Sequence, residues 1–302
     1  MELKNTDMPD KGWWDLLPKS THKWIRLARF DRPIGSWLLL LPCLWTLPLL
    51  NLKHSQIIYL FCIFFIGSFV MRSAGCVIND LWDKNIDRNI SRTRYRPLAN
   101  GEISIPQAFF FLFALLSIGL ICLLNLNQQT WIVGFISIPI IILYPLAKRF
   151  TQWPQIFLGL AFSWGVPTAW VAGGGSWDLG VFFIYLGSFF WVIGYDTIYG
   201  CQDRTEDKIF GVYNTAITAE NYLCNFIKII YFLAVFFFTI GGVYLNLHFG
   251  WFIGLLFMSI HLYSQTTKIK NINQDISLKI FQSNKIAGLF LFLGSGSKYL
   301  YF

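Results

Sequence analysis

Long apolar runs separated by short polar stretches are the main pattern of this chain. A helix that crosses the hydrocarbon core of a bilayer needs about 20 mostly apolar residues. Nine runs approach or reach that length, at residues 34–51, 57–78, 107–126, 130–147, 155–173, 179–197, 223–246, 250–267 and 285–302. The last run is the weakest, because it is short and contains Gly294 and Gly296. The pattern predicts an all-α polytopic membrane protein, a bundle of nine transmembrane helices around a central cavity.

Composition supports this class. Hydrophobic residues make up 55% of the chain and charged residues 13%, whereas a soluble domain carries about 25% charge. We expect residues 1–33 to form a cytoplasmic or interfacial segment and residues 34–302 a single transmembrane domain. The six cysteines contain no C-x-x-C pair, so we interpret them as small hydrophobic side chains.

The positions of the basic residues predict the orientation of the chain. If the N-terminus is cytoplasmic, 22 of the 24 lysines and arginines fall on inner segments, and only Lys53 and Lys298 fall outside. Cytoplasmic loops of membrane proteins carry such an excess of positive charge. The formal net charge of +8 is thereby explained without a nucleic-acid partner.

A group of acids follows the second apolar run, in the stretch NDLWDKNIDRN at residues 79–89. An α-helix turns by about 100° per residue, so Asp83 and Asp87 lie about 60° and 20° from Asp80. The three carboxylates share one narrow face if the helix continues past the membrane. Asn79 lies at the edge of that face.

A second group of acids follows the sixth run, in YDTIYGCQDRTEDKIFG at residues 195–211. On a continuous helix Asp196, Asp203 and Asp207 would again share one face. Asp203 and Asp207 alone form a D-x-x-x-D pair, one turn apart.

These two acidic groups need a neutralising partner, because like charges on one helix face repel. Mg²⁺ combines carboxylates with substrate phosphates. Basic residues that suit phosphate oxygens are interleaved: Lys84, Arg88, Arg92, Arg94, Arg96, Arg204 and Lys208. Solvated loop charges are the alternative, but the pattern occurs twice at helix ends on the same predicted side. We therefore favour a diphosphate clamp.

One charge, Arg72, lies inside the second apolar run, about 12 Å deeper than Asp80 at 1.5 Å per residue. A charge at such a depth is a functional-site hypothesis by default. Its guanidinium could hold a carboxylate in a bidentate fork. Snorkelling to the interface, or pairing with a neighbouring helix, is the alternative. Arg149, at the end of the fourth run, is an ordinary cation at a helix C-terminus.

The motifs N-D-x-x-D-x-x-x-D at 79–87 and D-x-x-x-D at 203–207 together resemble the UbiA superfamily of intramembrane prenyltransferases. The similarity extends over the chain after about residue 22 and is closest to the branch that acts on 4-hydroxybenzoate. The stretches that carry it are RFDRPIGSWLLLLPCLW (29–45), VMRSAGCVINDLWDKNIDRNISRTRYRPLANGEIS (70–104), YPLAKRFTQWPQ (144–155), GYDTIYGCQDRTEDKIFGVYNTA (194–216) and FQSNKIAGLFLFLG (281–294).

This resemblance implies a role for each candidate residue. Five acids would hold Mg²⁺ ions that bridge the prenyl diphosphate: Asp80, Asp83, Asp87, Asp203 and Asp207. Asn79 would orient the first group or contact the diphosphate. Arg72 and Arg149 would contact the carboxylate of 4-hydroxybenzoate, and Asp196 would lie near the acceptor and help remove its phenolic proton.

The implied reaction moves a polyprenyl group from polyprenyl diphosphate to the carbon ortho to the hydroxyl of 4-hydroxybenzoate, a step of ubiquinone biosynthesis. We expect a bacterial inner-membrane enzyme with cytoplasmic active-site loops, membrane lipid around it and no obligate protein partner. Naphthoate, homogentisate, haem or chlorophyllide acceptors remain as alternatives within the superfamily. A transporter would instead place its acids across the membrane midplane, whereas these acids cluster at one end. The prenyl length is left open.

Overall fold

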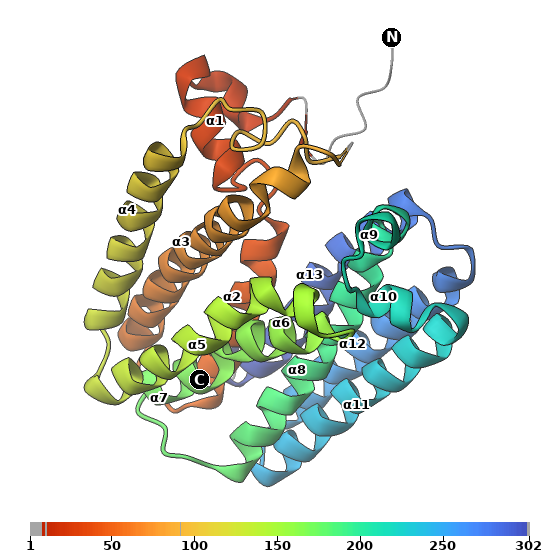
Figure 1. The fold of residues 1–302 in the computed structure, drawn as a ribbon. Helices are drawn as coiled ribbons and strands as arrows, with labels where there is room; N and C mark the ends of the chain where they lie inside the picture. Colours follow the sequence, from red (N-terminus) through yellow and green to blue (C-terminus); the bar gives the residue numbers. More distant parts are fainter. Residues whose placement is uncertain (1–7, 10, 91, 301–302) are drawn as a thin grey trace. The chain divides into compact units, whose positions relative to one another are not determined.

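The computed structural model describes residues 8–9, 11–90 and 92–300, and every regular element among them is a helix (Figure 1). The longer helices are α3 (His54–Asp87), α4 (Ile105–Leu124), α5 (Gln128–Phe150), α8 (Leu179–Gly200), α11 (Leu223–Tyr244), α12 (Phe249–Lys268) and α13 (Gln274–Gly296). The shorter ones are α1 (Lys19–Leu27), α2 (Ile34–Thr46), α6 (Pro154–Ser163), α7 (Gly165–Ala172), α9 (Arg204–Phe210) and α10 (Thr215–Thr218). The 3₁₀ turns are η1 (Trp13–Leu16), η2 (Leu47–Leu49), η3 (Glu220–Tyr222), η4 (Ile269–Asn271) and η5 (Ser297–Leu300).

The predicted all-helical membrane fold is confirmed, and each of the nine predicted apolar runs overlaps helix, the ninth over its described part, since residues 301–302 lie outside the described residues. Within the described residues, seven helical segments are long and apolar enough to cross a bilayer. The run at 34–51 forms a shorter apolar helix, Ile34–Leu49, and the run at 250–267 forms α12, which is not among the seven. The predicted count of nine spans is therefore not confirmed.

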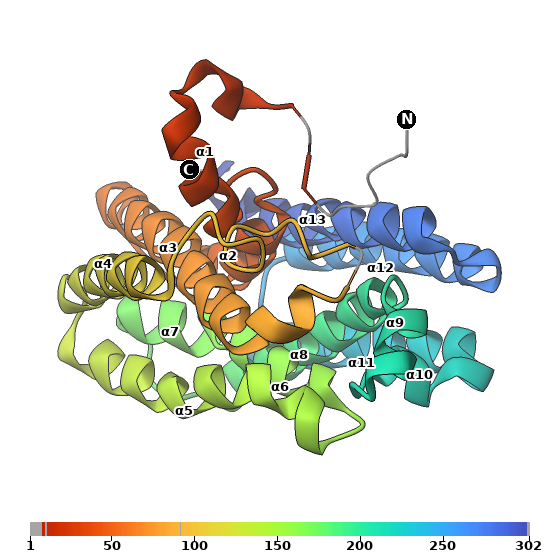
Figure 2. The same ribbon diagram turned by 45° about the horizontal axis from the view of Figure 1, so that its top comes forward.

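The chain packs into two compact units. Unit 1 consists of the described residues up to Trp37 together with residues 65–125, and unit 2 of residues 38–64 and 126–302. In unit 1, α3 and α4 run side by side in both views (Figure 1, Figure 2). Their facing apolar side chains form one core with the end of α1 and the loop before α4: Leu27, Val70, Ala74, Val77, Leu98, Ile103, Ala108, Leu112 and Leu115.

The core of unit 2 is built around α8, which packs against α6, α11 and α13. Glycines on α8 permit close packing: a Cβ on Gly194 would lie 2.3 Å from the Tyr231 ring of α11. Trp191 is fully buried, and its indole Nε1 donates to Asn284 Oδ1 of α13 at 3.0 Å. This hydrogen bond satisfies a polar group that would otherwise be costly to bury, so α8 and α13 are joined in a defined register.

Candidate functional site

Helix α3 continues without interruption from His54 to Asp87. Its 34 residues correspond to about 51 Å, which exceeds the roughly 30 Å of a bilayer core. The predicted apolar run ends at residue 78, so the last nine residues extend beyond the predicted span. The condition for a shared acidic face, a helix that continues through Asp87, is therefore met. Asp80, Asp83 and Asp87, the first acidic face, are all buried, at 1%, 3% and 5% exposure.

Two arginines of unit 1 bind this first acidic face. Arg29 Nη2 donates to both carboxylate oxygens of Asp80, at 2.7 and 2.8 Å. Arg96 Nη1 bridges Asp80 Oδ1 at 3.3 Å and Asp87 Oδ2 at 3.1 Å. Burial raises the pKa of Asp87, the charge of Arg96 opposes that rise, and the carboxylates of Asp80 and Asp83 add to it. The positive charge of Arg96 therefore favours the ionised form of Asp87.

Arg29 was not singled out by the sequence analysis, although it carries the closest ion pair of the face. It follows the last turn of α1 with a φ of 60°, a left-handed conformation that glycine usually adopts at helix ends. For a residue other than glycine, this backbone conformation costs on the order of 1 kcal/mol. Its Nη1 also donates to Arg26 O at 2.9 Å. An arginine at the end of an amphipathic helix, in the stretch RFDRP, was the available signal.

The remaining predicted phosphate-binding bases of unit 1 lie along the end of α3 and the loop after it. Arg88 is exposed, and its Nε donates to Ala99 O at 2.9 Å, which ties the loop to the helix end. Arg94 lies on the ring of Tyr95, with its Cζ 4.9 Å from the centroid. Lys84, Arg92 and Asn79 are half-buried. Among these bases, Arg96 contacts two of the acids directly, Asp80 and Asp87.

Arg72 is half-buried on α3, two helical turns before Asp80. Its side chain lies against Gly35 at the start of α2: a Cβ on Gly35 would lie 2.6 Å from Arg72 Nε. Gly35 therefore provides the space that this guanidinium occupies. The role of Arg72 as a carboxylate ligand stays a prediction.

The second acidic face, in unit 2, differs from the prediction. Helix α8 ends at Gly200 and α9 begins at Arg204, so Asp196 and Asp203 do not share a continuous helix. Between the helices the backbone forms 3₁₀-type turns, in which an N–H bonds the carbonyl three residues earlier. Cys201 N donates to Ile198 O, and Asp203 N donates to Gly200 O. The prediction of one helical face for three acids is wrong for this reason. Asp203 and Asp207 remain one turn apart, because Asp207 N donates to Asp203 O at 2.8 Å.

Asn214 positions the second acid pair and was also missed by the sequence analysis. Its Nδ2 donates to Asp207 Oδ2 at 2.8 Å and to Gly200 O at 2.9 Å. Its Oδ1 accepts from Ala216 N at 2.9 Å and from Gln155 Nε2 at 3.3 Å. The residue is 5% exposed, so these bonds tie the end of α8, α9 and α6 together in a buried network. An asparagine N-cap before Thr-Ala was the only local signal.

The predicted bases of unit 2 have acidic or backbone neighbours that the sequence did not reveal. Lys208 forms an ion pair with Glu220, and Arg204 Nη1 lies 3.9 Å from Glu220 Oε1. Arg149 is exposed in the last turn of α5. The neighbouring Lys148 O accepts from Tyr213 N at 3.0 Å, which fixes the end of α5 to the loop after α9.

The acidic faces offer carboxylate oxygens as ligands for a metal ion. In the part of the chain that the structure describes, no three His, Cys, Asp or Glu side chains are arranged as a ready metal site. The donor set fits Mg²⁺ chemically, since it consists of carboxylate oxygens. At Asp80 a metal would share its carboxylate with Arg29 and Arg96 or replace them.

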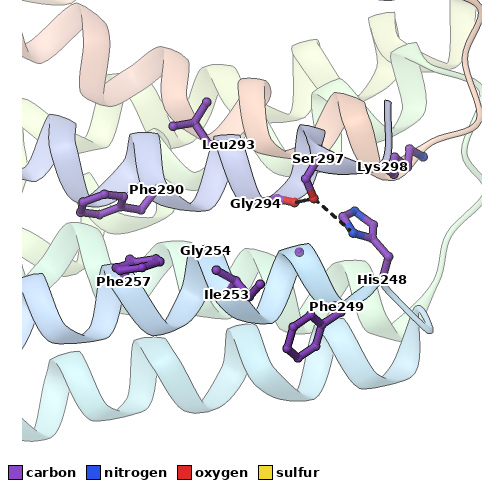
Figure 3. A pocket seen from close by; sticks show the side chains of 11 residues that line it. His248, Phe249, Ile253, Gly254, Phe257, Phe290, Leu293, Gly294, Ser297 and Lys298 are labelled. Carbon is purple, nitrogen blue, oxygen red and sulfur yellow. Dashed lines mark hydrogen bonds between the residues drawn. The ribbon is translucent and has the colours of Figure 1, made fainter. Parts of the chain in front are cut away.

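A groove of about 680 Å³ lies between α12 and α13 in unit 2 (Figure 3). Its walls are apolar side chains, among them Phe257, Phe290 and Leu293. His248 and Lys298 lie at one end, where the imidazole Nδ1 of His248 is 3.4 Å from Ser297 Oγ. Among the described residues no carboxylate lines this groove, so these residues lack the metal-binding chemistry of the two acidic faces.

The decisive comparison is with a family model. The model described as the UbiA prenyltransferase family matches residues 39–293. The chain belongs to this family. It is an integral membrane protein with the UbiA fold, which agrees with its apolar helices.

Relatives of this UbiA chain carry consistent names. A protein of Aedes aegypti named 4-hydroxybenzoate polyprenyltransferase, mitochondrial, is 38% identical over 272 residues, 89% of this chain and 62% of the relative. The chain thus spans less than two thirds of that relative. A protein of Haemophilus ducreyi named 4-hydroxybenzoate octaprenyltransferase is 36% identical over 271 residues, 89% of this chain and 97% of the relative. The structure of a UbiA homolog from Archaeoglobus fulgidus bound to GPP and Mg²⁺ superposes with a TM-score of 0.65 at 19% identity, over 91% of this chain and 99% of the homolog.

Proposed function

We propose that this chain transfers a polyprenyl group from polyprenyl diphosphate to the carbon ortho to the hydroxyl of 4-hydroxybenzoate, releasing diphosphate. The observation that carries the proposal is the buried acidic face of α3 in a UbiA-family chain. The names of its relatives, at 36–38% identity over 89% of this chain, support the acceptor. We further propose the bacterial inner membrane as its location, with the N-terminus and both acidic faces cytoplasmic.

The diphosphate end of the substrate is proposed to bind at the acidic faces. Asp80, Asp83 and Asp87 of unit 1, and Asp203 and Asp207 of unit 2, would hold Mg²⁺. When bound, Mg²⁺ supplies positive charge for the negative charge that develops on the leaving diphosphate. The homolog of Archaeoglobus fulgidus with GPP and Mg²⁺ supports this choice of metal.

The basic residues around the acidic faces are proposed to contact phosphate oxygens. They are Lys84, Arg88, Arg92, Arg96, Arg204 and Lys208, with Asn79 at the edge of the first face. Arg96 already bridges two acids of that face, so it would deliver a fixed guanidinium beside the diphosphate. Fixed cations stabilise developing charge more effectively than mobile ones, because they need no reorganisation during the reaction.

The aromatic acid is proposed to bind through its carboxylate. Arg72 is the first candidate, since its guanidinium lies in the space left by Gly35, and Arg149 is the second. The hydroxyl group activates the ortho carbon of the ring, which attacks the allylic carbon as its bond to the diphosphate breaks. Asp196 is proposed to take the phenolic proton as the ring attacks and to return it to the ring oxygen when the ring proton is lost to solvent, which restores aromaticity. The apolar interior would keep water from the allylic cation.

One assay tests the proposed activity. Membranes containing the full chain receive labelled 4-hydroxybenzoate and a polyprenyl diphosphate, with Mg²⁺ or with a chelator. We expect a labelled lipid product with Mg²⁺ and none with the chelator. Product from dihydroxynaphthoate or homogentisate, with none from 4-hydroxybenzoate, would assign the chain to another branch of the family.

A further inference from the structure

Helix α1 carries its basic residues on one side. Taking about 100° per residue, Lys19, His22, Lys23 and Arg26 fall within an arc of about 100°. Trp24, on the other side, contacts the Phe111 ring of α4 with centroids 5.2 Å apart. Leu27 is fully buried in the core of unit 1. The apolar side of α1 is therefore anchored in unit 1, and its basic side faces away from that core.

The basic side of α1 lines an open cavity of about 540 Å³. No ion pair involves Lys19, Lys23 or Arg26 in the described structure. The Nε of Arg26 is buried and has no hydrogen-bond partner among the described residues. The charges of Lys19, Lys23 and Arg26 on this side of α1 suit an anion that enters the open cavity.

Two carboxylates also line this cavity, and both are engaged locally. Asp15 Oδ2 accepts from Gly12 N at 3.0 Å, and Glu102 Oε1 accepts from Asn100 Nδ2 at 2.8 Å. Both acids are exposed. They complete turns of their own segments and form no ion pair with the cations of α1 in the described structure, where Lys23 Nζ lies over the Trp24 ring, 5.5 Å from its centroid.

Large apolar side chains are exposed directly before this basic face. Trp13 is 55% exposed, Leu16 90% and Leu17 40%, all in or beside η1. Exposed apolar side chains next to a basic helical face are typical of segments that lie in the membrane interface. The end of α1 also adjoins the end of a membrane helix, through Arg29 and Asp80.

We propose that η1 and the basic side of α1 form a binding site for anionic phospholipids. The phosphate of the lipid is held by Lys19, Lys23 and Arg26, and Trp13 and Leu16 enter the boundary between headgroups and acyl chains. An anionic phospholipid matches both the basic and the exposed apolar side chains, whereas a soluble anion matches only the basic ones. None of these residues belongs to either acidic face, and the proposal is independent of the proposed transferase activity.

Photo-crosslinking tests this site in the full chain. The crosslinker p-benzoylphenylalanine replaces Leu16, and the protein is placed in nanodiscs of phosphatidylcholine with a minority of phosphatidylglycerol. Mass spectrometry then gives the ratio of the two lipid adducts. We expect phosphatidylglycerol to be enriched over its share of the disc at this position. At Phe110, which is 76% exposed on α4, the matched crosslinker should report the disc composition itself.

Variants of the basic face make the test specific. Lys23→Gln should lower the adduct ratio about fivefold, since one basic side chain near an anionic surface contributes about 1 kcal/mol. Lys19→Gln/Lys23→Gln/Arg26→Gln should lower it to the disc composition. Lys268→Gln/Lys270→Gln/Lys279→Gln removes the same charge from exposed lysines of unit 2 and should keep the enrichment.

Several results would overturn the proposal. Absence of lipid adducts at position 16 would show that η1 does not reach the bilayer. Enrichment that persists in the α1 triple variant would assign the preference to another surface. Loss of enrichment on addition of millimolar diphosphate, at constant ionic strength, would show a site for soluble diphosphate. If the triple variant does not fold, Lys19→Gln/Lys23→Gln decides the same question with Arg26 in place.

Discussion

At the scale of single residues, the ion pair between Arg29 and Asp80 is the feature that the sequence concealed. The acids themselves were predictable, because their spacing is visible in the chain. Arg29 lies 51 positions before its partner, and only the fold of unit 1 brings the two together. Its backbone is left-handed, a conformation that is uncommon for arginine.

Two substitutions of Arg29 distinguish the effect of its charge from the effect of its backbone conformation. We expect Arg29→Ala to lose most transferase activity and to lower the free energy of unfolding by about 3 kcal/mol, because a buried carboxylate loses one partner. Arg29→Gly removes the same charge but suits the left-handed conformation, so it should be more stable than Arg29→Ala and equally inactive. Chemical denaturation and the labelled-product assay measure the two effects. Equal stability of the two variants would contradict the proposed backbone strain.

Gly35 offers an indirect test of Arg72. A Cβ at Gly35 would displace the Arg72 guanidinium, so Gly35→Ala should raise the KM for 4-hydroxybenzoate several-fold and leave the KM for the diphosphate nearly unchanged. Arg72→Ala should act in the same direction and more strongly. Gly75→Ala is the matched control on α3, since nothing lies within 4 Å of the added Cβ. A comparable change in both KM values would argue against a carboxylate-binding role.

At the scale of elements, α3 and α8 show what periodicity can and cannot predict. The acid spacing gives one face only if the helix continues past its apolar run to Asp87, and α3 does continue to that residue. The same calculation of angles on a continuous helix gives a wrong result after α8, because 3₁₀-type turns at Cys201–Asp203 interrupt the helix. Those turns are stabilised by Asn214, which bonds the carbonyl of Gly200 from 14 positions away. A contact between residues so far apart in the chain produces no periodic pattern in the sequence.

The network around Asn214 should control how well the second acidic face binds metal. Asn214→Ala removes the donor to Asp207 and leaves Gly200 O without that bond, a loss of about 1–3 kcal/mol for a buried polar group. We expect activity to require more Mg²⁺ and kcat to fall several-fold. Asn221→Ala, an exposed asparagine nearby, should behave as the unchanged chain does. An unaltered Mg²⁺ requirement in Asn214→Ala would show that Asp207 is positioned by other contacts.

At the scale of the whole molecule, the two acidic faces belong to different compact units. The resemblance to UbiA enzymes implies that they act on one diphosphate, and this implication can be tested without catalysis. Mg²⁺ together with inorganic diphosphate should stabilise the full chain against thermal unfolding, by about 2.7 kcal/mol when the ligand is at one hundred times its Kd. If the ligand needs both faces, Asp83→Asn in unit 1 and Asp203→Asn in unit 2 should each abolish the stabilisation. Asp275→Asn, an exposed acid in the first turn of α13, should retain it. Retention of half the effect in each variant would instead indicate two independent metal sites, one in each unit.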